Sequence, residues 1–223
     1  MKDSPCVTMN CDGIAPYYET VEHFTFLRHL ERRRFAFIGE ARKARKAIVC
    51  GGGDGRFLAR LLRGNAWVQV DIVEMSFSMI ELTEKRVAGM GPSYRERVRF
   101  RHGDIRTIDL ANGWYDLIVT NFFLDCFFKP ELQCVVNRLA SCGTPETKWI
   151  VSDFKEAHSA LGRVWTQGVI AGLYAAFWAT TGLRGIRLPQ YRAALANAGY
   201  SVRFEEEALG GLLYSSVWQA CTP

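Results

Sequence analysis

Short apolar segments alternate with helical ones along the middle of the chain, and this alternation is the strongest constraint on its fold. Helical segments, in which apolar residues recur on one face, are Arg56 to Leu62, Ser78 to Val87 and Glu131 to Leu139. Strands that alternate with helices in this way predict βαβ units and a parallel sheet. The five segments that read as buried strands are Ala47 to Cys50, Trp67 to Val73, Val98 to Arg101, Tyr115 to Thr120 and Trp149 to Ser152.

The C-terminal part departs from this alternation. A helix at about Pro189 to Ala198 ends at Gly199, and two strands follow, Tyr200 to Ala208 and Leu212 to Gln219. Only Gly210-Gly211 joins these strands, and parallel neighbours need a much longer crossover. We therefore predict an α/β fold whose mostly parallel sheet ends in an antiparallel hairpin.

Local signals mark where two of the helices begin. Asp54 precedes Arg56 as a candidate N-cap, and Ser78 with Glu81 three residues later resembles a capping box. Before the first strand, apolar residues spaced by three predict an amphipathic helix over Tyr17 to Ile38.

Composition is consistent with one compact domain. The 223 residues are 48% hydrophobic and 23% charged, which is enough to bury a single core. We predict a single domain over 1–223, with an N-terminal helical cap at 1–46, a ligand-binding half at 47–153, and a helical lid plus terminal hairpin at 154–223.

Cysteine and histidine usage argues against structural cross-links. The seven cysteines include no CxxC pair, and none of the four histidines lies near them at the spacing of zinc ligands. We expect neither a disulfide framework nor a metal site. The N-terminus lacks the apolar segment of a secretory signal, so the expected location is the cytoplasm.

The net charge of +5 comes from one short segment. Eight basic and two acidic residues lie between Arg28 and Lys46, and the rest of the chain is close to neutral. A phosphate-binding stripe and a solvated helix face both fit this pattern, but the second is commoner. We therefore expect no nucleic-acid partner.

The stretch Val164 to Leu183 carries no charge and has the length of a membrane span. Its large side chains, however, recur on one helical stripe from Trp165 to Trp178, with small and polar residues such as Gly168 and Gly172 behind them. A one-sided stripe suits a helix that covers a core or pocket, so no membrane span is predicted. The two glycines would permit close helix packing, which leaves a homodimer open.

A glycine loop follows the first strand and opens a helix. Its sequence, Cys50-Gly51-Gly52-Gly53-Asp54-Gly55, lies where open α/β sheets bind ligands. The dinucleotide fingerprint needs a glycine where Arg56 stands, and Asp54 would repel a pyrophosphate at the helix start. The loop favours a nucleoside ligand without phosphates, while a tight strand-to-helix turn is the alternative.

Acidic residues follow the second and third strands. Glu74 lies about 20 residues beyond the glycine loop, where a carboxylate accepts hydrogen bonds from a ribose diol; Asp71 falls within the strand. Asp104 is placed to accept from an exocyclic adenine amine, with the aliphatic Ile105 covering the ring face. Each acid alone is equally consistent with a solvated loop carboxylate.

These motifs resemble a known family. The series AIVCGGGDGRF, VDIVEMSFSMI, HGDIRTIDL, YDLIVTNFFLDCF and WIVSDF is similar to the ordered motifs of class I S-adenosylmethionine-dependent methyltransferases, from Ala47 to the C-terminus. The resemblance implies a three-layer Rossmann-like sandwich with a seven-stranded sheet whose last strand is inserted antiparallel. It also implies S-adenosylmethionine as cofactor and a cofactor site in which each motif contributes one part. The residues so implied are Gly51, Gly52 and Gly53 at the methionine part, Glu74 and Met75 at the ribose, Asp104 and Ile105 at the adenine, and Asn121 and Phe122 beneath the sulfonium.

One position departs from the family pattern. The family usually has an acid two residues before the first loop glycine, and Val49 stands there in this chain. Asp54 is the residue that would compensate, by engaging the cofactor ammonium directly or through water. The alternative is that the cofactor binds somewhat differently.

Methyl transfer needs a general base only where the acceptor is protonated. The catalytic candidates are Asp125 after the fourth strand, His158 after the fifth, and Tyr17 on the N-terminal helix, where Tyr18 and His23 lie near it. Asp125 is equally consistent with a helix cap or turn, and the two histidines with surface or packed positions.

The residues beside the expected cofactor suggest the acceptor. Four phenylalanines occur in NFFLDCFF, and the aromatic stripe follows the fifth strand, so the walls suit a small, largely apolar or aromatic metabolite. The asparagine-proline-proline-aromatic motif of many enzymes that methylate bases is missing. Three other readings stay open: intramolecular cyclisation or other non-methyl chemistry of the cofactor, an RNA methyltransferase, and a fold retained as a non-catalytic scaffold.

Overall fold

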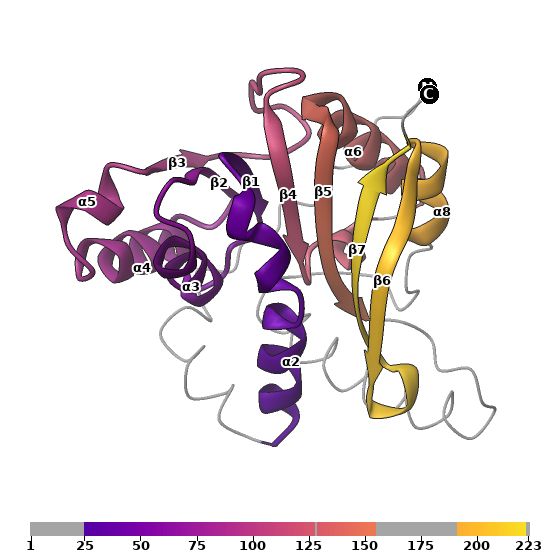
Figure 1. Cartoon of the computed structure of the whole chain (residues 1–223), viewed down its shortest axis with the longest axis horizontal. Coiled ribbons are helices and arrows are strands. Elements are labelled where there is room, and N and C mark those ends of the chain that lie inside the picture. Colours follow the sequence, from indigo (N-terminus) through magenta and orange to yellow (C-terminus); the bar gives the residue numbers. More distant parts are fainter. Residues whose placement is uncertain (1–24, 128, 155–190, 222–223) are drawn as a thin grey trace, which may run out of the picture.

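A computed structural model describes residues 25–127, 129–154 and 191–221 of the chain (Figure 1). Several sequence predictions lie outside these residues. They concern Tyr17, Tyr18, His23, Phe128, His158 and the segment 164–183 with its two glycines.

Seven strands form one sheet. They are β1 (Lys46–Cys50), β2 (Gln69–Glu74), β3 (Val98–His102), β4 (Tyr115–Asn121), β5 (Gly143–Phe154), β6 (Tyr200–Ala208) and β7 (Leu213–Ala220). Their order is β3-β2-β1-β4-β5-β7-β6; the first five are parallel, and β7 pairs antiparallel with both β5 and β6. In Figure 1, β5 accordingly points downward and β7 upward. The predicted fold class, including the antiparallel C-terminal hairpin, is confirmed.

Helices cover both faces of the sheet. The α-helices are α2 (Thr25–Phe35), α3 (Arg56–Gly64), α4 (Phe77–Ala88), α5 (Pro92–Arg95), α6 (Lys129–Cys142) and α8 (Tyr191–Asn197). Three short 3-10 helices are η2 (Ile38–Lys43), η3 (Leu124–Cys126) and η4 (Leu209–Gly211). Helices α2, α3 and α4 lie on one face of the sheet, and α6 with α8 lies on the other (Figure 1).

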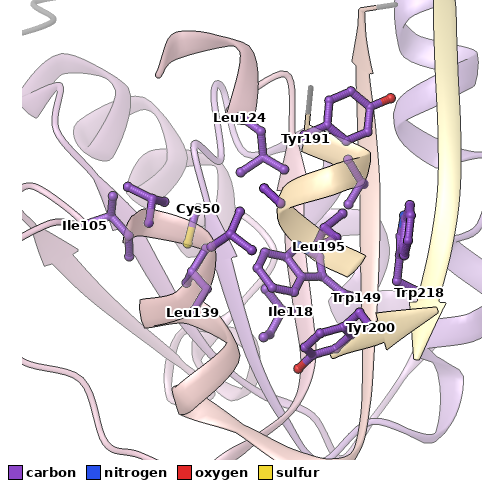
Figure 2. Packing of buried hydrophobic residues seen from close by; sticks show 14 of the residues in the cluster. Cys50, Ile105, Ile118, Leu124, Leu139, Trp149, Tyr191, Leu195, Tyr200 and Trp218 are labelled. Carbon is purple, nitrogen blue, oxygen red and sulfur yellow. The ribbon is translucent and has the colours of Figure 1, made fainter. Parts of the chain in front are cut away.

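Two apolar cores result from the alternation of side chains along each strand. On β1, Ile48 packs into the core under α6 and α8, whereas Val49 packs into the core under α3. The first core centres on Trp149, whose Nε1 donates to Thr120 Oγ1 over 2.9 Å and whose ring meets Tyr200 edge to face (Figure 2). Strands such as β1 are buried on both faces, which explains why their sequences are continuous runs of apolar residues.

Both predicted helix caps prove wrong by one or two positions. Gly55, with a left-handed φ of 79°, is the N-cap of α3, in place of Asp54. Its Cβ would lie 2.7 Å from Thr83 Cγ2, so the close approach of α4 requires glycine here. The N-cap of α4 is Ser76, whose side chain accepts from Met79 N, in place of Ser78.

The C-terminal hairpin has a longer turn than predicted. Gly210 and Gly211 do not form a two-residue loop, because Leu209 also lies outside the pairing of β6 with β7. The 3-10 helix η4 forms the turn, and β7 begins at Leu213. All three residues have positive φ, and in Leu209 the value is 54°. The sequence shows two glycines but not that a leucine shares their conformation.

The basic segment is only partly solvated. Arg34 is 6% exposed, and its guanidinium lies 3.8 Å from the Asp54 carboxylate. Arg33 forms an ion pair with Glu206 of β6 at 2.9 Å. Part of the local charge therefore joins α2 to the body of the protein, which corrects the expectation of a purely solvated helix face.

Asn65 holds the turn between α3 and β2 by four hydrogen bonds. Its amide nitrogen donates to the carbonyl oxygens of Ala41 and Ala44 at 2.9 and 2.8 Å. Its amide oxygen accepts from the backbone nitrogens of Trp67 and Val68 at 2.9 and 3.1 Å. The side chain is buried, so no water replaces these partners.

We expect Asn65→Ala to lower the free energy of unfolding by about 3 kcal/mol, because it leaves buried carbonyl and N–H groups without partners. Urea denaturation followed by circular dichroism measures this. Asn112→Ala is the matched control: Asn112 is exposed, and the control should stay within about 0.5 kcal/mol of the parent protein. Equal effects of the two substitutions would contradict the assignment.

Candidate active site

The carboxyl ends of β1, β2, β4 and β5 meet at one edge of the sheet. At these ends lie the glycine loop, which follows β1, and three residues of the strands themselves: Glu74 of β2, Asn121 of β4 and Asp153 of β5. Strand order reverses between β1 and β4, because β2 lies on one side of β1 and β4 on the other. Open α/β sheets bind their ligands at such a switch point.

Backbone geometry in the glycine loop requires glycine at two positions. Gly51 and Gly53 have φ values of 66° and 56°. The nitrogen of Gly51 donates to Val73 O at 3.1 Å, which ties the loop to the end of β2. A Cβ on Gly51 would lie 2.7 Å from the ring of Phe123, so the loop after β4 packs directly on the loop after β1.

Asp54 is fully buried and surrounded by arginines. Its carboxylate lies 2.6 Å from Arg56 Nε, 3.2 Å from Arg86 Nη2 and 3.8 Å from Arg34 Nη1. Arg86 Nε also donates to the Asp54 carbonyl at 2.7 Å. A carboxylate with no exposed surface and three cations around it fixes the shape of the loop. This geometry does not favour the expected contact with a cofactor ammonium.

Glu74 stands at the tip of β2 beside the glycine loop. Its Oε1 accepts from the backbone nitrogens of Met75 at 2.9 Å and Ser76 at 3.1 Å, and Gly53 N–H also hydrogen-bonds the carboxylate. Burial raises the pKa of this carboxyl, while the N–H groups of Ser76, Met75 and Gly53 oppose the rise. The structure thus holds a carboxylate in a fixed orientation at the switch point. Met75 takes part through its backbone, whose oxygen also contacts His102 Nε2 at 3.0 Å.

Asp104 is engaged by its own neighbour. Arg106 Nε and Nη2 reach its carboxylate at distances between 2.5 and 3.0 Å, and Arg106 Nη1 reaches Glu131 at 3.1 Å. Burial disfavours the charged form, but the hydrogen bonds and charge of Arg106 outweigh it and hold the pKa of Asp104 below its usual range. Ile105 is buried in the core under α6 with Cys50 and Val73 (Figure 2).

Asn121 ends β4 with an amide that lacks partners. The residue is 6% exposed, and neither its Oδ1 nor its Nδ2 has a hydrogen-bond partner among the described residues. A buried amide without partners is costly, and such groups mark places where a bound molecule supplies the missing contact.

Phe122 adopts a left-handed backbone with φ of 52°, which is strained for an aromatic residue. Its nitrogen donates to Ser152 O at 2.6 Å, and its ring packs against Phe154 at 5.4 Å. Arg34 lies over the same ring at 5.9 Å. The strain turns the chain sharply after β4, so that Phe123 covers Gly51 while Phe122 faces the side of α2.

Two carboxyls lie near each other after β4 and β5. Asp125 in η3 is a sequence candidate, and its backbone nitrogen donates to Asp153 Oδ2 at 3.2 Å. Asp153, which the sequence reasoning missed, is fully buried. The sequence does contain a signal for Asp153, an acid directly after the apolar run WIVS. Glu74 comes after the apolar residues of β2 in the same way.

The structure therefore brings most described candidates to one edge. The glycine loop, Glu74 and Asn121 lie at β1, β2 and β4, and Asp125 lies in the loop after β4. The arginines around Asp54 were also missed, because sequence separation hides them. Among the described residues no three His, Cys, Asp or Glu side chains gather as a metal site.

Residues 48–146 match a family model described as a methyltransferase domain. This range contains the glycine loop, Glu74, Asp104, Asn121 and Asp125. Solved structures described as S-adenosylmethionine-dependent methyltransferases or O-methyltransferases share the fold of the chain at 16–17% identity. The resemblance to methyltransferases inferred from the motifs is confirmed over the matched residues.

Solved structures share the fold of the chain at low sequence identity. The mitomycin 7-O-methyltransferase MmcR is 16% identical with a TM-score of 0.61, and the match covers 92% of this chain and 60% of MmcR. The CcbJ methyltransferase from Streptomyces caelestis is 17% identical with a TM-score of 0.66, covering 95% of this chain and 97% of CcbJ. The [4+2]-cyclase SpnF is 12% identical with a TM-score of 0.72, covering 95% of this chain and 94% of SpnF.

The chain spans about three fifths of the length of MmcR but nearly the whole of the other two proteins. No curated protein matches the chain in sequence. None of the helices in the described ranges has the length and hydropathy needed to span a bilayer.

The contact between Gly51 and Phe123 makes a testable prediction. Gly51→Ala introduces both an unfavourable φ and a collision, so we expect it to lower the free energy of unfolding by about 2 kcal/mol or more. Gly113→Ala is the control, because Gly113 has a similar φ of 60° and a Cβ there meets nothing within 4 Å. The control should cost only about 1 kcal/mol.

Chemical denaturation of both variants, of Phe123→Ala and of Gly51→Ala/Phe123→Ala measures the difference. The double substitution should cost less than the sum of the single ones, because removing the ring removes the collision. Strict additivity would contradict the proposed contact.

Proposed function

We propose that this chain transfers a methyl group from S-adenosylmethionine to a small, largely apolar or aromatic metabolite by in-line displacement. The observation that carries the proposal is the Glu74 carboxylate, held by backbone N–H groups beside the glycine loop at the switch point of the sheet. A nucleoside with a free ribose diol suits a carboxylate in that position.

The residues of this edge fit the proposed cofactor. Glu74 would accept hydrogen bonds from the ribose hydroxyls, and the Asn121 amide would gain the partners it lacks from the methionine part or the sulfonium region. Gly51, Gly52 and Gly53 would allow the close backbone approach that this part of the cofactor needs. Asp54 would act indirectly, because its three arginines hold the loop that the cofactor contacts.

At the adenine end, Asp104 would accept from the exocyclic amine while it shares its oxygens with Arg106. Ile105 lies in the core beneath, where it would support the pocket wall. The bound cofactor supplies an electrophilic methyl group, and the chain has to align the acceptor with it and exclude water.

Asp125 is the proposed general base among the described candidates. Burial raises the pKa of its carboxyl to about 6, opposed by a hydrogen bond from Cys126. Such a carboxylate is ionised at neutral pH and is a stronger base than an exposed one. Tyr17 and His158 stay candidates from the sequence alone.

Aromatic side chains support the apolar character of the acceptor. Phe123 and Phe127 meet edge to face at 5.1 Å next to Asp125. The name of MmcR describes O-methylation of mitomycin, a small molecule, and its similarity in fold agrees with a small acceptor. A second candidate is non-methyl chemistry, since the cyclase SpnF shares the fold over nearly its whole length.

Cofactor binding is tested by isothermal titration with S-adenosylmethionine. We expect Glu74→Gln to weaken binding at least about tenfold, because glutamine keeps an oxygen for Met75 and Ser76 but loses the charge that the ribose contacts. Glu84→Gln is the control, since Glu84 lies on α4 and pairs only with the exposed Arg95 among the described residues. Absence of binding by the parent protein would overturn the proposed function.

Methyl transfer is tested by release of S-adenosylhomocysteine in the presence of a panel of small phenols, with mass spectrometry of the products. We expect the rate to fall as the pH falls through about 6, because Asp125 becomes protonated there, and we expect Asp125→Asn to remove this acid limb. Consumption of the cofactor without any acceptor would instead favour the non-methyl alternative.

A further inference from the structure

Asp153 joins the end of β5 to the turn that carries Asp125. Its Oδ1 accepts from its neighbour Phe154 N at 2.8 Å, and its Oδ2 accepts from Asp125 N at 3.2 Å. Leu124 N–H also hydrogen-bonds this carboxyl. The backbone of η3 is therefore arranged around the Asp153 side chain, which brings the two carboxyls together.

No cation in the described part of the chain forms an ion pair with either carboxyl. Arg192 is the charged residue on α8 nearest this region, and it pairs with Glu205 at 3.0 Å. The Tyr214 hydroxyl donates to the same Glu205 at 3.1 Å. The buried Asp153 and the partly buried Asp125, which have no such cation, contrast with Asp54 and Asp104, each of which has arginine partners.

Tyr191, the first residue of α8, lies on the same side of the sheet. Asp153 pairs in register with Tyr214 of β7, and the Tyr191 and Tyr214 rings lie 5.9 Å apart. Tyr191 is 3% exposed, and its hydroxyl has no hydrogen-bond partner among the described residues. In Figure 2 the ring lies beside Leu124 and its hydroxyl points away from the centre of the apolar cluster.

Repulsion and burial determine the charge of the Asp125 and Asp153 carboxyls. The ionised forms of two adjoining buried carboxyls repel each other, so the pair retains a proton that isolated carboxyls would lose. Burial, and then the charge of Asp125, raise the pKa of Asp153, and the charge of Asp153 adds to burial in raising the pKa of Tyr191. Cys126 Sγ donates to Asp125 Oδ1, and Tyr191 interacts with Asp153. The groups that act on Tyr191 besides Asp153 are Tyr214, Arg192 and Glu205.

We propose that Asp125 and Asp153 hold one proton between them and, with Tyr191, form the subsite that receives the hydroxyl group of the methyl acceptor. The inference rests on the proposed function and names its substrate class, an acceptor that is methylated on oxygen. The acceptor hydroxyl donates to the ionised carboxyl, while the Tyr191 hydroxyl donates to the acceptor oxygen and gains the partner it lacks.

The reaction balances with the groups present. The bond from oxygen to the methyl carbon forms as the bond from carbon to the cofactor sulfur breaks, and the sulfur keeps the electron pair. The hydroxyl proton passes to the carboxyl pair, which changes from one negative charge to none. That proton leaves to water after the product, and no oxidant or reductant is required.

Carbon-13 NMR of aspartate-labelled protein, titrated with pH, tests the pair without cofactor or acceptor. We expect the two carboxyl carbons to titrate in separate steps, one of them above pH of about 6. Asp125→Asn should lower the titration of Asp153 by about one pH unit or more, since it removes the neighbouring charge that raises the pKa of Asp153.

Asp116→Asn is the matched control. Asp116 also accepts backbone N–H bonds, from Arg45 and Lys46, but at the other end of β4. The Asp116→Asn substitution should leave the titration of Asp125 and Asp153 unchanged. Two carboxyls that titrate independently below pH of about 4.5, or an Asp153 titration that Asp125→Asn does not move, would overturn the inference. Because no ligand is present, this result is separate from any failure of the protein to bind S-adenosylmethionine.

Tyr191→Phe separates an acceptor contact from simple packing. We expect the KM for a phenol acceptor to rise about tenfold while the Tm is unchanged or higher, because the substitution removes an unpaired buried hydroxyl. Tyr200→Phe is the control, since the Tyr200 hydroxyl already has Thr147 as a partner; its loss should lower the Tm and leave the KM unchanged. A Tyr191→Phe variant with lower Tm and unchanged KM would overturn the role of this hydroxyl.

Discussion

The buried carboxylate of Asp54 is the interaction on which the shape of the site depends. Its arginine partners come from three helices, Arg34 from α2, Arg56 from α3 and Arg86 from α4. A buried ion pair adds little net stability over an apolar replacement, but loss of one partner leaves an uncompensated charge and is strongly unfavourable. The arrangement therefore admits one relative position of the helices, and this position sets where the glycine loop faces the carboxyl ends of β2 and β4.

The order of strands and helices could be predicted from the sequence because both faces of the sheet are buried. A strand such as β4 then reads as an apolar run, and the short segment between two strands indicates the hairpin. The caps and the turn could not be predicted to the residue. Gly55 is the cap of α3 because α4 packs closely on it at Thr83, a tertiary contact that has no local signal. Ser76 caps α4 through a local hydrogen bond from Met79 N, and the sequence offered Ser78 two residues later with the same chemistry. Leu209 shares its turn with two glycines, and its positive φ has no local signal either.

In the candidate site, too, some residues could be predicted from local sequence and others depend on tertiary contacts. Glu74 was recognisable because a carboxylate after an apolar strand, at a fixed distance from a glycine loop, has a known chemical use. Asp153 has the same local pattern, yet its meaning depends on η3 folding back so that Asp125 N reaches it. The ion pairs of Asp54 could not be predicted for a related reason, since two of its three arginines lie far away in the sequence.

The acids at the two ends of the site differ in whether arginines neutralise them. At the cofactor end, Asp54 and Asp104 are neutralised by arginines of the same chain, so these acids add little negative charge to the pocket. At the proposed acceptor end, Asp125 and Asp153 have no ion-pair partner among the described residues, and a proton is the smallest group that balances one of them. A sulfonium loses its positive charge during methyl transfer, while a hydroxyl acceptor must lose a proton. A carboxyl pair that holds one proton can accept a second, and so can take the proton that the hydroxyl acceptor loses. Its single negative charge lies on the acceptor side of the reacting bond and is neutralised by that proton as the product forms.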